Sequence, residues 1–298
     1  TLKSAGLIAI FLPMHTATML AIKVLPKIKK LNSNAYLAFY GLYAAINKDL
    51  LLSLGGKTII SGEFENSLVL LYQCLVNNRI VKDLDFVSLK KQNFRKPKRS
   101  DLPNLNSYSK LINGKGRLIT VGYTEGTRGC KHVCRHCPVV PVYNGRFFVV
   151  QPDVVMEDIR QQVEAGAEHI TFGDPDFFNG PGHALKLVES FHQEFPNLTY
   201  DVTIKVQHLL YHRGKISLLV GTGCLFVTTA VEEIDDQVLC KLGKNHTRSD
   251  FIKVVKVAKA AGLSLSPTFI PFHPWTTTFG FVDLLSMIIE LNMIENLS

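Results

Sequence analysis

The chain has 298 residues, of which 46% are hydrophobic and 19% are charged. This length and composition allow one large core or two moderate ones and exclude a disordered acidic or basic polymer. Of the 6 cysteines, three are clustered and the other three are scattered in apolar surroundings, which is not the pattern of a disulfide-stapled secreted domain, so we expect a reducing cytoplasm.

The apolar opening of the chain is not expected to cross a membrane. Pro13, His15 and Lys23 interrupt it well short of the roughly 20 residues that a span requires, and we expect no targeting segment in this stretch. Strands and helices instead alternate over the first block, with expected strands at 6–12, 35–40 and 57–61 and expected helices at 16–31, 47–54 and 64–77. This alternation predicts a parallel sheet covered by helices, a Rossmann-like domain over residues 1–80. Three strands leave the block incomplete on its own.

A basic segment follows, and we predict a linker over residues 81–116. The run "LKKQNFRKPKRSD" at 89–101 carries much of the formal net charge of +8. A solvated linker explains such a run, and phosphate binding is the alternative, because clustered Lys and Arg are what counterion release requires. Aromatic residues are 9% and do not interleave with the basic ones, so a nucleic-acid reader is not favoured.

The second block, residues 117–298, repeats strand and helix at longer spacing. The expected strands are 118–124, 168–173, 199–206, 224–231 and 263–270, and the expected helices are 153–166, 182–195, 235–242, 248–261 and 279–293. Such units predict a βα barrel, whole or partial. In "TYDVTIKV", Val202 and Ile204 alternate with Asp201, Thr203 and Lys205, which predicts an apolar phase toward the helices and a polar phase toward the barrel interior. An antiparallel strand with its polar face in water is the alternative.

The stretch "TRGCKHVCRHCPVVPVY" at 127–143 carries the most specific chemistry. It contains three thiols in eight residues, Cys130, Cys134 and Cys137, with Lys131, His132, Arg135 and His136 between them. Thiols at this spacing can converge on one metal centre, and their basic neighbours favour thiolates. Zinc would need His132 or His136 as a fourth ligand, whereas a 4Fe-4S cluster would keep one iron open. The end of the first barrel strand is where βα barrels place reactive groups, which favours the open iron.

"GCKHVCRHC" resembles the Cys-x3-Cys-x2-Cys signature of the radical S-adenosylmethionine (SAM) family, with His136 as the ring-bearing residue before the third Cys. "VGYTEGTRGCKHVCRHCPVVPVY", "ITFGDPDFFNGPGHAL" and "YDVTIKV" resemble an uncharacterised bacterial subgroup named for a CUAEP or CCAEP tail, which this chain lacks. The resemblance implies an α/β protein with a partial, cobalamin-binding-like Rossmann domain followed by a partial (βα)6 barrel. The barrel is expected to be truncated before its sixth strand, and the chain to be a fragment cut at both ends.

The resemblance also implies a reaction and its cofactors. Cys130, Cys134 and Cys137 would hold a 4Fe-4S cluster, SAM would chelate the open iron, and reductive cleavage would give methionine and a 5'-deoxyadenosyl radical. A reductant such as flavodoxin or ferredoxin would supply the electron, and the substrate is unknown.

Further SAM contacts are implied at four positions besides His136. Gly173 and Asp174, in "GDPD", occupy the place of a family motif that binds the SAM amino group, although Asp174 also suits a turn. Lys205 would meet the SAM carboxylate and Glu232 the ribose hydroxyls. A structural ion pair is the alternative for Lys205.

Cobalamin is the weakest implication. The family motif for a histidine-ligated cobalamin is Asp-x-His-x-x-Gly, and around His15 the sequence has Pro13 for Asp and Thr18 for Gly. This departure argues against cobalamin, while the fold alone keeps it open. The alternatives to the main hypothesis are therefore a cobalamin-dependent radical SAM methylase and a non-enzymatic zinc protein that uses the three cysteines and a His.

Overall fold

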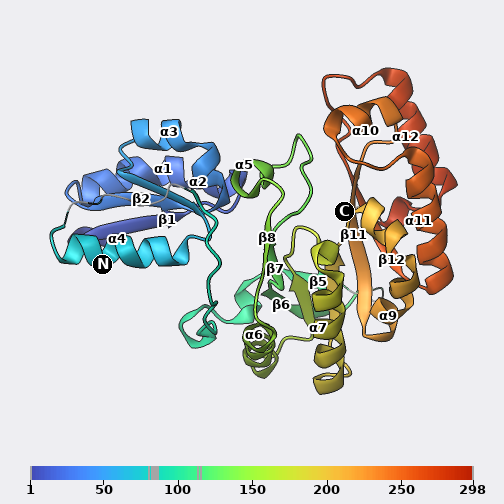
Figure 1. The fold of residues 1–298 in the computed structure, drawn as a ribbon, viewed down its shortest axis with the longest axis horizontal. Coiled ribbons are helices and arrows are strands. Elements are labelled where there is room, and N and C mark those ends of the chain that lie inside the picture. The colour runs from blue at the N-terminus through green and yellow to red at the C-terminus, as the bar shows by residue number, and fades with distance from the viewer. Residues whose placement is uncertain (1, 80, 82–86, 113, 115, 297–298) are drawn as a thin grey trace. The chain divides into compact units, whose positions relative to one another are not determined.

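The computed structural model describes residues 2–79, 81, 87–112, 114 and 116–296. It divides into two compact units (Figure 1). Unit 1 comprises Thr1–Gln92 and His136–Arg146, and unit 2 comprises Asn93–Arg135 and Phe147–Ser298. Among the described residues, no helix is both long enough and apolar enough to cross a membrane.

Unit 1 is built on a short parallel sheet. Its strands are β1 (Leu7–Phe11), β2 (Tyr36–Tyr40), β3 (Thr58–Gly62) and β4 (Val87–Ser88), paired in that order. Helices α1 (His15–Leu31), α2 (Leu42–Ile46) and α3 (Lys48–Ser53) pack on one face, and α4 (Glu65–Val76) packs on the other (Figure 1). The short helix α5 (Val140–Tyr143) also belongs to this unit. Because both faces are covered, the strands are nearly continuous apolar runs rather than alternating ones.

The structure adds a strand that sequence periodicity did not predict. Strand β4 lies inside the predicted linker and pairs with β3 through Ser61 to Val87 and Gly62 to Ser88. Two residues are too few to carry a periodic signal. Gly62 has a φ of +72°, and a Cβ there would lie 2.1 Å from the Ser88 carbonyl oxygen, so only glycine allows this close approach. Strand β4 thus adds a fourth strand to the three that the sequence predicted for the first block.

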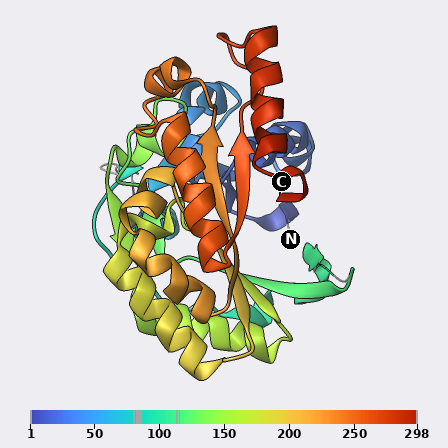
Figure 2. The ribbon, with the colours of Figure 1, turned by 90° about the vertical axis from the view of Figure 1, so that its right-hand side faces the viewer.

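Unit 2 contains the predicted partial barrel. Its sheet runs β12 (Ser264–Phe269), β11 (Cys224–Glu232), β10 (Thr199–Thr203), β9 (His169–Phe172), β6 (Leu118–Thr124) and β5 (Lys110–Ile112), parallel except for β5. The helices are α6 (Pro152–Glu164), α7 (Pro181–Glu194), α8 (Val206–Tyr211), α9 (Ile216–Gly221), α10 (Asp236–Leu242), α11 (Arg248–Ala261) and α12 (Thr278–Glu290). Figure 2 shows helices along the outer face of the curved sheet. The α/β fold with a partial barrel is confirmed, and β5 occupies the edge beside β6.

The two faces of β10 differ as the alternation predicted. Val202 and Ile204 are fully buried in the same apolar cluster as Phe191 of α7. On the other phase, Asp201 accepts hydrogen bonds from the polar side chains of β9. The strand is shorter than expected, however, because Lys205 is already the N-cap of α8. Val206, which continues the apolar phase of Val202 and Ile204, therefore belongs to helix α8 (Val206–Tyr211).

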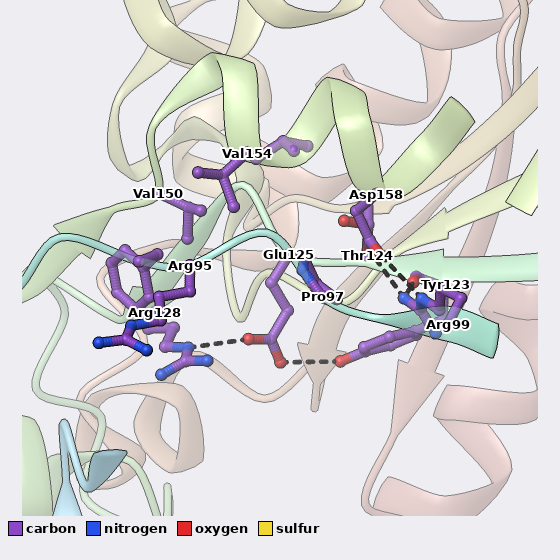
Figure 3. A pocket seen from close by; sticks show the side chains of 12 residues that line it. Arg95, Pro97, Arg99, Tyr123, Thr124, Glu125, Arg128, Val150, Val154 and Asp158 are labelled. Atoms are coloured by element: carbon purple, nitrogen blue, oxygen red, sulfur yellow. Dashed lines mark hydrogen bonds and ion pairs between the residues drawn. The ribbon is translucent and has the colours of Figure 1, made fainter. Parts of the chain in front are cut away.

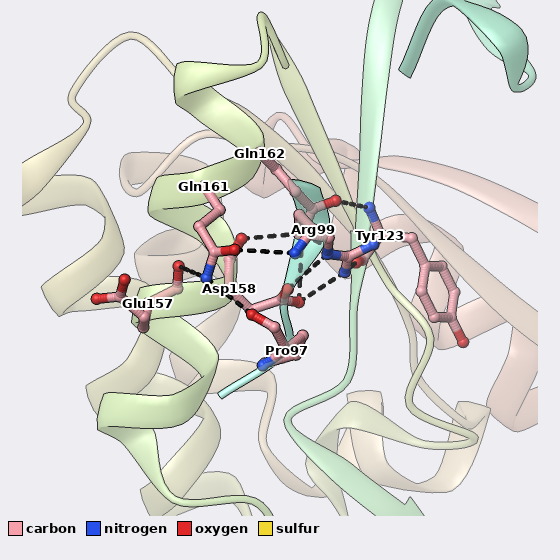
Figure 4. A network of polar contacts seen from close by, with 7 residues as sticks. All are labelled: Pro97, Arg99, Tyr123, Glu157, Asp158, Gln161 and Gln162. Carbon is pink, nitrogen blue, oxygen red and sulfur yellow. Dashed lines mark hydrogen bonds and ion pairs between the residues drawn. The ribbon is translucent and has the colours of Figure 1, made fainter. Parts of the chain in front are cut away.

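The basic segment is not a bare solvated linker where the structure describes it. Arg99, in a 3-10 turn over Arg99–Asp101, binds both carboxylate oxygens of Asp158 at 2.7 and 2.8 Å (Figure 4). Arg99 also donates to the Tyr123 carbonyl, while Gln161 contacts the backbone of Pro97 and Arg99. These bonds fix the segment to α6 and β6. Residues 82–86, 113 and 115 of the predicted linker lie outside the described residues, and the domain limits at 80 and 117 stay a prediction.

Candidate active site

The cysteine loop begins where β6 ends. The strand β7 (Thr127–Gly129) pairs with β8 (Phe147–Val149) and carries the chain directly into Cys130. Cys130 and Cys134 are both buried in unit 2, with 8% and 7% of their surface exposed. Cys137 is half-buried and, with His136, belongs to the segment His136–Arg146 that groups with unit 1. The structure thus places two of the three predicted thiols together in the barrel unit.

Two polar residues from other barrel elements reach this loop. The Lys205 ammonium donates to the Cys134 Sγ at 3.3 Å, and only 5% of Lys205 is exposed. Asn179 accepts from the Lys131 amide at 3.1 Å and donates to the Gly129 carbonyl at 3.2 Å, so it holds the backbone on both sides of Cys130. An ammonium beside Cys134 complements the negative charge of a metal-bound thiolate. Lys205 therefore contacts a cysteine, and its expected contact with SAM stays a prediction.

Asp174 fixes the start of the same loop. Its carboxylate accepts from the Gly126 amide at 2.8 Å and from the Thr127 hydroxyl at 2.6 Å, and the residue is 2% exposed. Burial raises the pKa of Asp174 to about 7 although these hydrogen bonds oppose the shift. Both carboxylate oxygens thus have partners within the protein. The neighbouring Gly173 has a steric reason to be glycine, because a Cβ there would lie 1.8 Å from the Tyr123 hydroxyl oxygen.

A buried cluster of two histidines and one aspartate lies beside the loop. Asp176 Oδ2 is 3.3 Å from His132 Nε2 and 2.7 Å from His208 Nδ1. Burial lowers the pKa of His132, and the contacts with both histidines outweigh burial in lowering the pKa of Asp176. Because His132 contacts Asp176, the structure does not favour it as the fourth ligand of a cysteine zinc cage.

Glu232 ends β11 in an unusual backbone conformation. Its φ is +69°, in the left-handed region that few residues other than glycine adopt. Its carboxylate accepts from the Lys244 ammonium at 3.2 Å, and Lys244 is 2% exposed. The carboxyl end of a barrel strand is a functional position, and a strained residue there is consistent with a constrained role.

A pocket of about 240 Å³ is lined by residues of the basic segment, of α6 and of the stretch that leads into the cysteine loop (Figure 3). Glu125 lies at its centre and accepts from the Arg128 guanidinium and the Tyr123 hydroxyl, each at 3.1 Å. Burial, followed by the charge of Glu125, raises the pKa of Tyr123. Arg128 also lies over the Phe94 ring, 4.7 Å from its centroid. These contacts tie the segment to the residues that precede Cys130.

Sequence analysis missed three residues that the fold brings to the loop: Asn179, Asp176 and His208. The first two lie in "GDPDFFNG", directly after β9, where polar residues at the carboxyl end of a parallel strand are a usable signal. His208 lies in α8, which the periodicity did not predict, so no signal marked it.

Comparison with known proteins gives the family. The Radical SAM superfamily matches residues 124–285, which is more than half of the chain. The bacteriochlorophyllide d C-8(2)-methyltransferase of Chlorobaculum tepidum is 25% identical over 255 residues, covering 79% of this chain and 53% of that protein. The chain thus spans about half the length of this curated relative.

Two solved structures share the fold over nearly the whole chain. The radical SAM methyltransferase TsrM from Kitasatospora setae, with cobalamin and a [4Fe-4S] cluster bound, has a TM-score of 0.74 at 14% identity, covering 96% of this chain and 60% of that one. The cobalamin-dependent SAM radical enzyme OxsB, with aqua-cobalamin and SAM bound, has a TM-score of 0.66 at 13% identity. The match covers 96% of this chain and 44% of OxsB. Because both are described with cobalamin, the sequence argument against that cofactor is not supported. The match of the family across the cysteine loop and the barrel shows that the chain belongs to the radical SAM superfamily.

Proposed function

We propose that the chain is the SAM-cleaving part of a radical SAM enzyme. The observation that carries this proposal is the family match over a loop in which Cys134 receives a hydrogen bond from the buried Lys205. When bound, a 4Fe-4S cluster supplies the electron that cleaves SAM to methionine and a 5'-deoxyadenosyl radical. Cys130, Cys134 and Cys137 would hold the cluster.

The chain's own residues would position the loop and bind SAM. Asp174 and Asn179 hold the backbone before and around Cys130. Gly173 lets Tyr123 pack against β9, and a side chain at Gly173 would displace the tyrosine. In this proposal the contribution of Asp174 to SAM binding is to position the loop, since both its oxygens are already bonded.

Three side chains are left for direct SAM contacts. Lys205 would meet the SAM carboxylate, Glu232 the ribose hydroxyls, and His136 would lie against the cofactor as the ring-bearing residue before the third cysteine. The contacts that Lys205 and Glu232 make within the protein support these two roles to different degrees. Lys205 lies within reach of Cys134, whereas Glu232 is bonded to Lys244 and would have to share its carboxylate.

Anaerobic purification and metal analysis test the proposal. We expect about four irons and matching sulfide per chain, loss of both in Cys134→Ala, and release of 5'-deoxyadenosine with dithionite and SAM. Lys205→Met should lower the yield of 5'-deoxyadenosine, whereas the control Lys215→Met, on the surface of the same unit, should not. Stoichiometric zinc without iron would refute the proposal and favour the zinc protein.

A cobalamin-dependent methylase is the second candidate. The shared fold with TsrM and OxsB extends over unit 1, whose parallel sheet has the architecture that binds ligands at the carboxyl ends of its strands. His15 is exposed and begins α1, directly after β1, at that edge. A purified protein that retains a corrinoid would support this candidate. Retention in His15→Ala would show that His15 is not the metal ligand, and a protein that takes up no corrinoid would exclude the candidate.

The remaining partners follow from the proposed reaction. A reductant such as flavodoxin or ferredoxin would deliver the electron, and the formal net charge of +8 suits an acidic electron carrier. A cluster with thiolate ligands is best kept in a reducing cytoplasm, which is the location we propose. The substrate is left open.

A further inference from the structure

We propose that His132, Asp176 and His208 form a second metal site, distinct from the three cysteines and specific for a divalent first-row transition ion such as zinc. Each residue offers one ligand atom, and the three atoms lie within 4.8 Å of one another. The site goes beyond the proposed function, because neither cluster binding nor SAM cleavage requires it.

The three atoms are buried and lack ordinary partners. Asp176 is fully buried, and the side chains of His208 and His132 are 7% and 11% exposed. Within the described part of the chain, His132 Nε2, Asp176 Oδ2 and His208 Nδ1 have no hydrogen-bond partner, although the two nitrogens lie 3.3 and 2.7 Å from the same oxygen. The nitrogens approach Asp176 without the alignment of a hydrogen bond. Buried polar atoms of this kind need a partner, and a shared cation would serve all three.

The donor set and its spacing fit such an ion. Two imidazole nitrogens and one carboxylate oxygen suit zinc or iron(II) rather than magnesium or calcium, which prefer oxygen ligands. With metal–ligand bonds of about 2.1 Å, neighbouring ligand atoms are about 3.0 Å apart in an octahedral site and about 3.4 Å apart in a tetrahedral one. The observed 2.7 and 3.3 Å lie close to these values.

The surrounding elements hold the ligands in place and leave one side open. Asp176 Oδ1 accepts from the Phe178 amide at 3.1 Å, which directs Oδ2 toward the histidines. His132 and His208 also line a pocket of about 420 Å³, together with Lys131, Gln207, Tyr211, His212 and Asn245. A bound ion would therefore have protein ligands on one side and open positions toward the pocket, the arrangement of a site that binds a further ligand.

Metal analysis of the cluster-loaded full chain tests this site, because iron then occupies the cysteines and zinc reports the histidines. After equilibration with zinc and desalting, we expect about one zinc per chain in addition to the cluster iron. Asp176→Asn, which retains an acceptor for Phe178, and His208→Asn should each lose the zinc and keep the iron. His212→Asn is the matched control, since His212 lines the same pocket outside the triad, and it should keep both.

A second measurement separates this site from the cysteines. Cobalt(II) added to Cys134→Ala should give visible d–d bands without strong thiolate-to-cobalt charge transfer, and Asp176→Asn in the same background should abolish them. The proposal is overturned if the cluster-loaded protein binds no zinc, or if zinc persists at one per chain in both triad variants. A missing cluster with retained zinc would instead count against the proposed SAM cleavage alone.

Discussion

Replacing Asp174 with Asn should stabilise the protein at neutral and alkaline pH. Asp174 accepts two hydrogen bonds, from the Gly126 amide and the Thr127 hydroxyl. An Asn side chain can accept the first through its oxygen and donate the second to the Thr127 oxygen, so both contacts can persist. The substitution therefore removes the buried charge without removing the link to the loop.

The magnitude follows from the pKa. Burial raises the pKa of Asp174 from 3.8 to about 7, so the folded protein holds the proton more tightly than the unfolded chain. A raised folded-state pKa contributes stability that is fully present below the unfolded value and is lost as pH rises toward the folded value. The loss is about 1.4 kcal/mol per pH unit between the two pKa values and falls off near pH 7, which gives roughly 2 kcal/mol between pH 5 and pH 7 and little further change above pH 8.

Urea unfolding of the full chain across this pH range measures the effect. Trp275 is the single tryptophan and lies in unit 2 with Asp174, so its fluorescence follows unfolding of the relevant unit. The free energy of unfolding of Asp174→Asn minus that of the wild type should rise with pH up to about pH 7. Asp283→Asn is the control, because Arg248 lowers the pKa of Asp283 below 3.8 and the difference between this variant and the wild type should therefore stay constant above about pH 5. A difference for Asp174→Asn that is constant with pH, or that falls as pH rises, would refute the reasoning.

Three further substitutions test how the loop is held. Gly173→Ala should displace Tyr123 and lower the free energy of unfolding by about 1–3 kcal/mol. In a Tyr123→Ala background this cost should largely vanish, and equal costs in both backgrounds would contradict the predicted clash. Arg99→Ala should cost about 3–5 kcal/mol by leaving the buried Asp158 carboxylate without its cationic partner. The added change Asp158→Asn should recover much of this cost, as urea unfolding would show. Asn179→Ala should weaken cluster retention by roughly 10–100-fold, and unchanged iron after desalting would count against its positioning role.

The cysteine spacing and the strand–helix alternation were sufficient to predict the chemistry and the fold class. Three thiols within eight residues can reach one metal centre without help from the rest of the fold, because they are close along the chain. The alternation of Asp201 with Val202 likewise reports a strand with one apolar and one polar face, which the structure confirms.

Only the tertiary structure decided which distant residues meet at the loop. Asp174 and Asn179 lie in the segment after β9, Lys205 is the N-cap of α8, and His208 lies within α8. Each of the four contacts a residue of the loop after β6. Parallel strands bring their carboxyl ends to one edge of the sheet, but the side chains that touch there depend on strand register and helix starts. Strand β4 pairs through two residues only, and Arg99 is held by a single buried carboxylate. Neither contact repeats along the sequence, so neither can be predicted from periodicity.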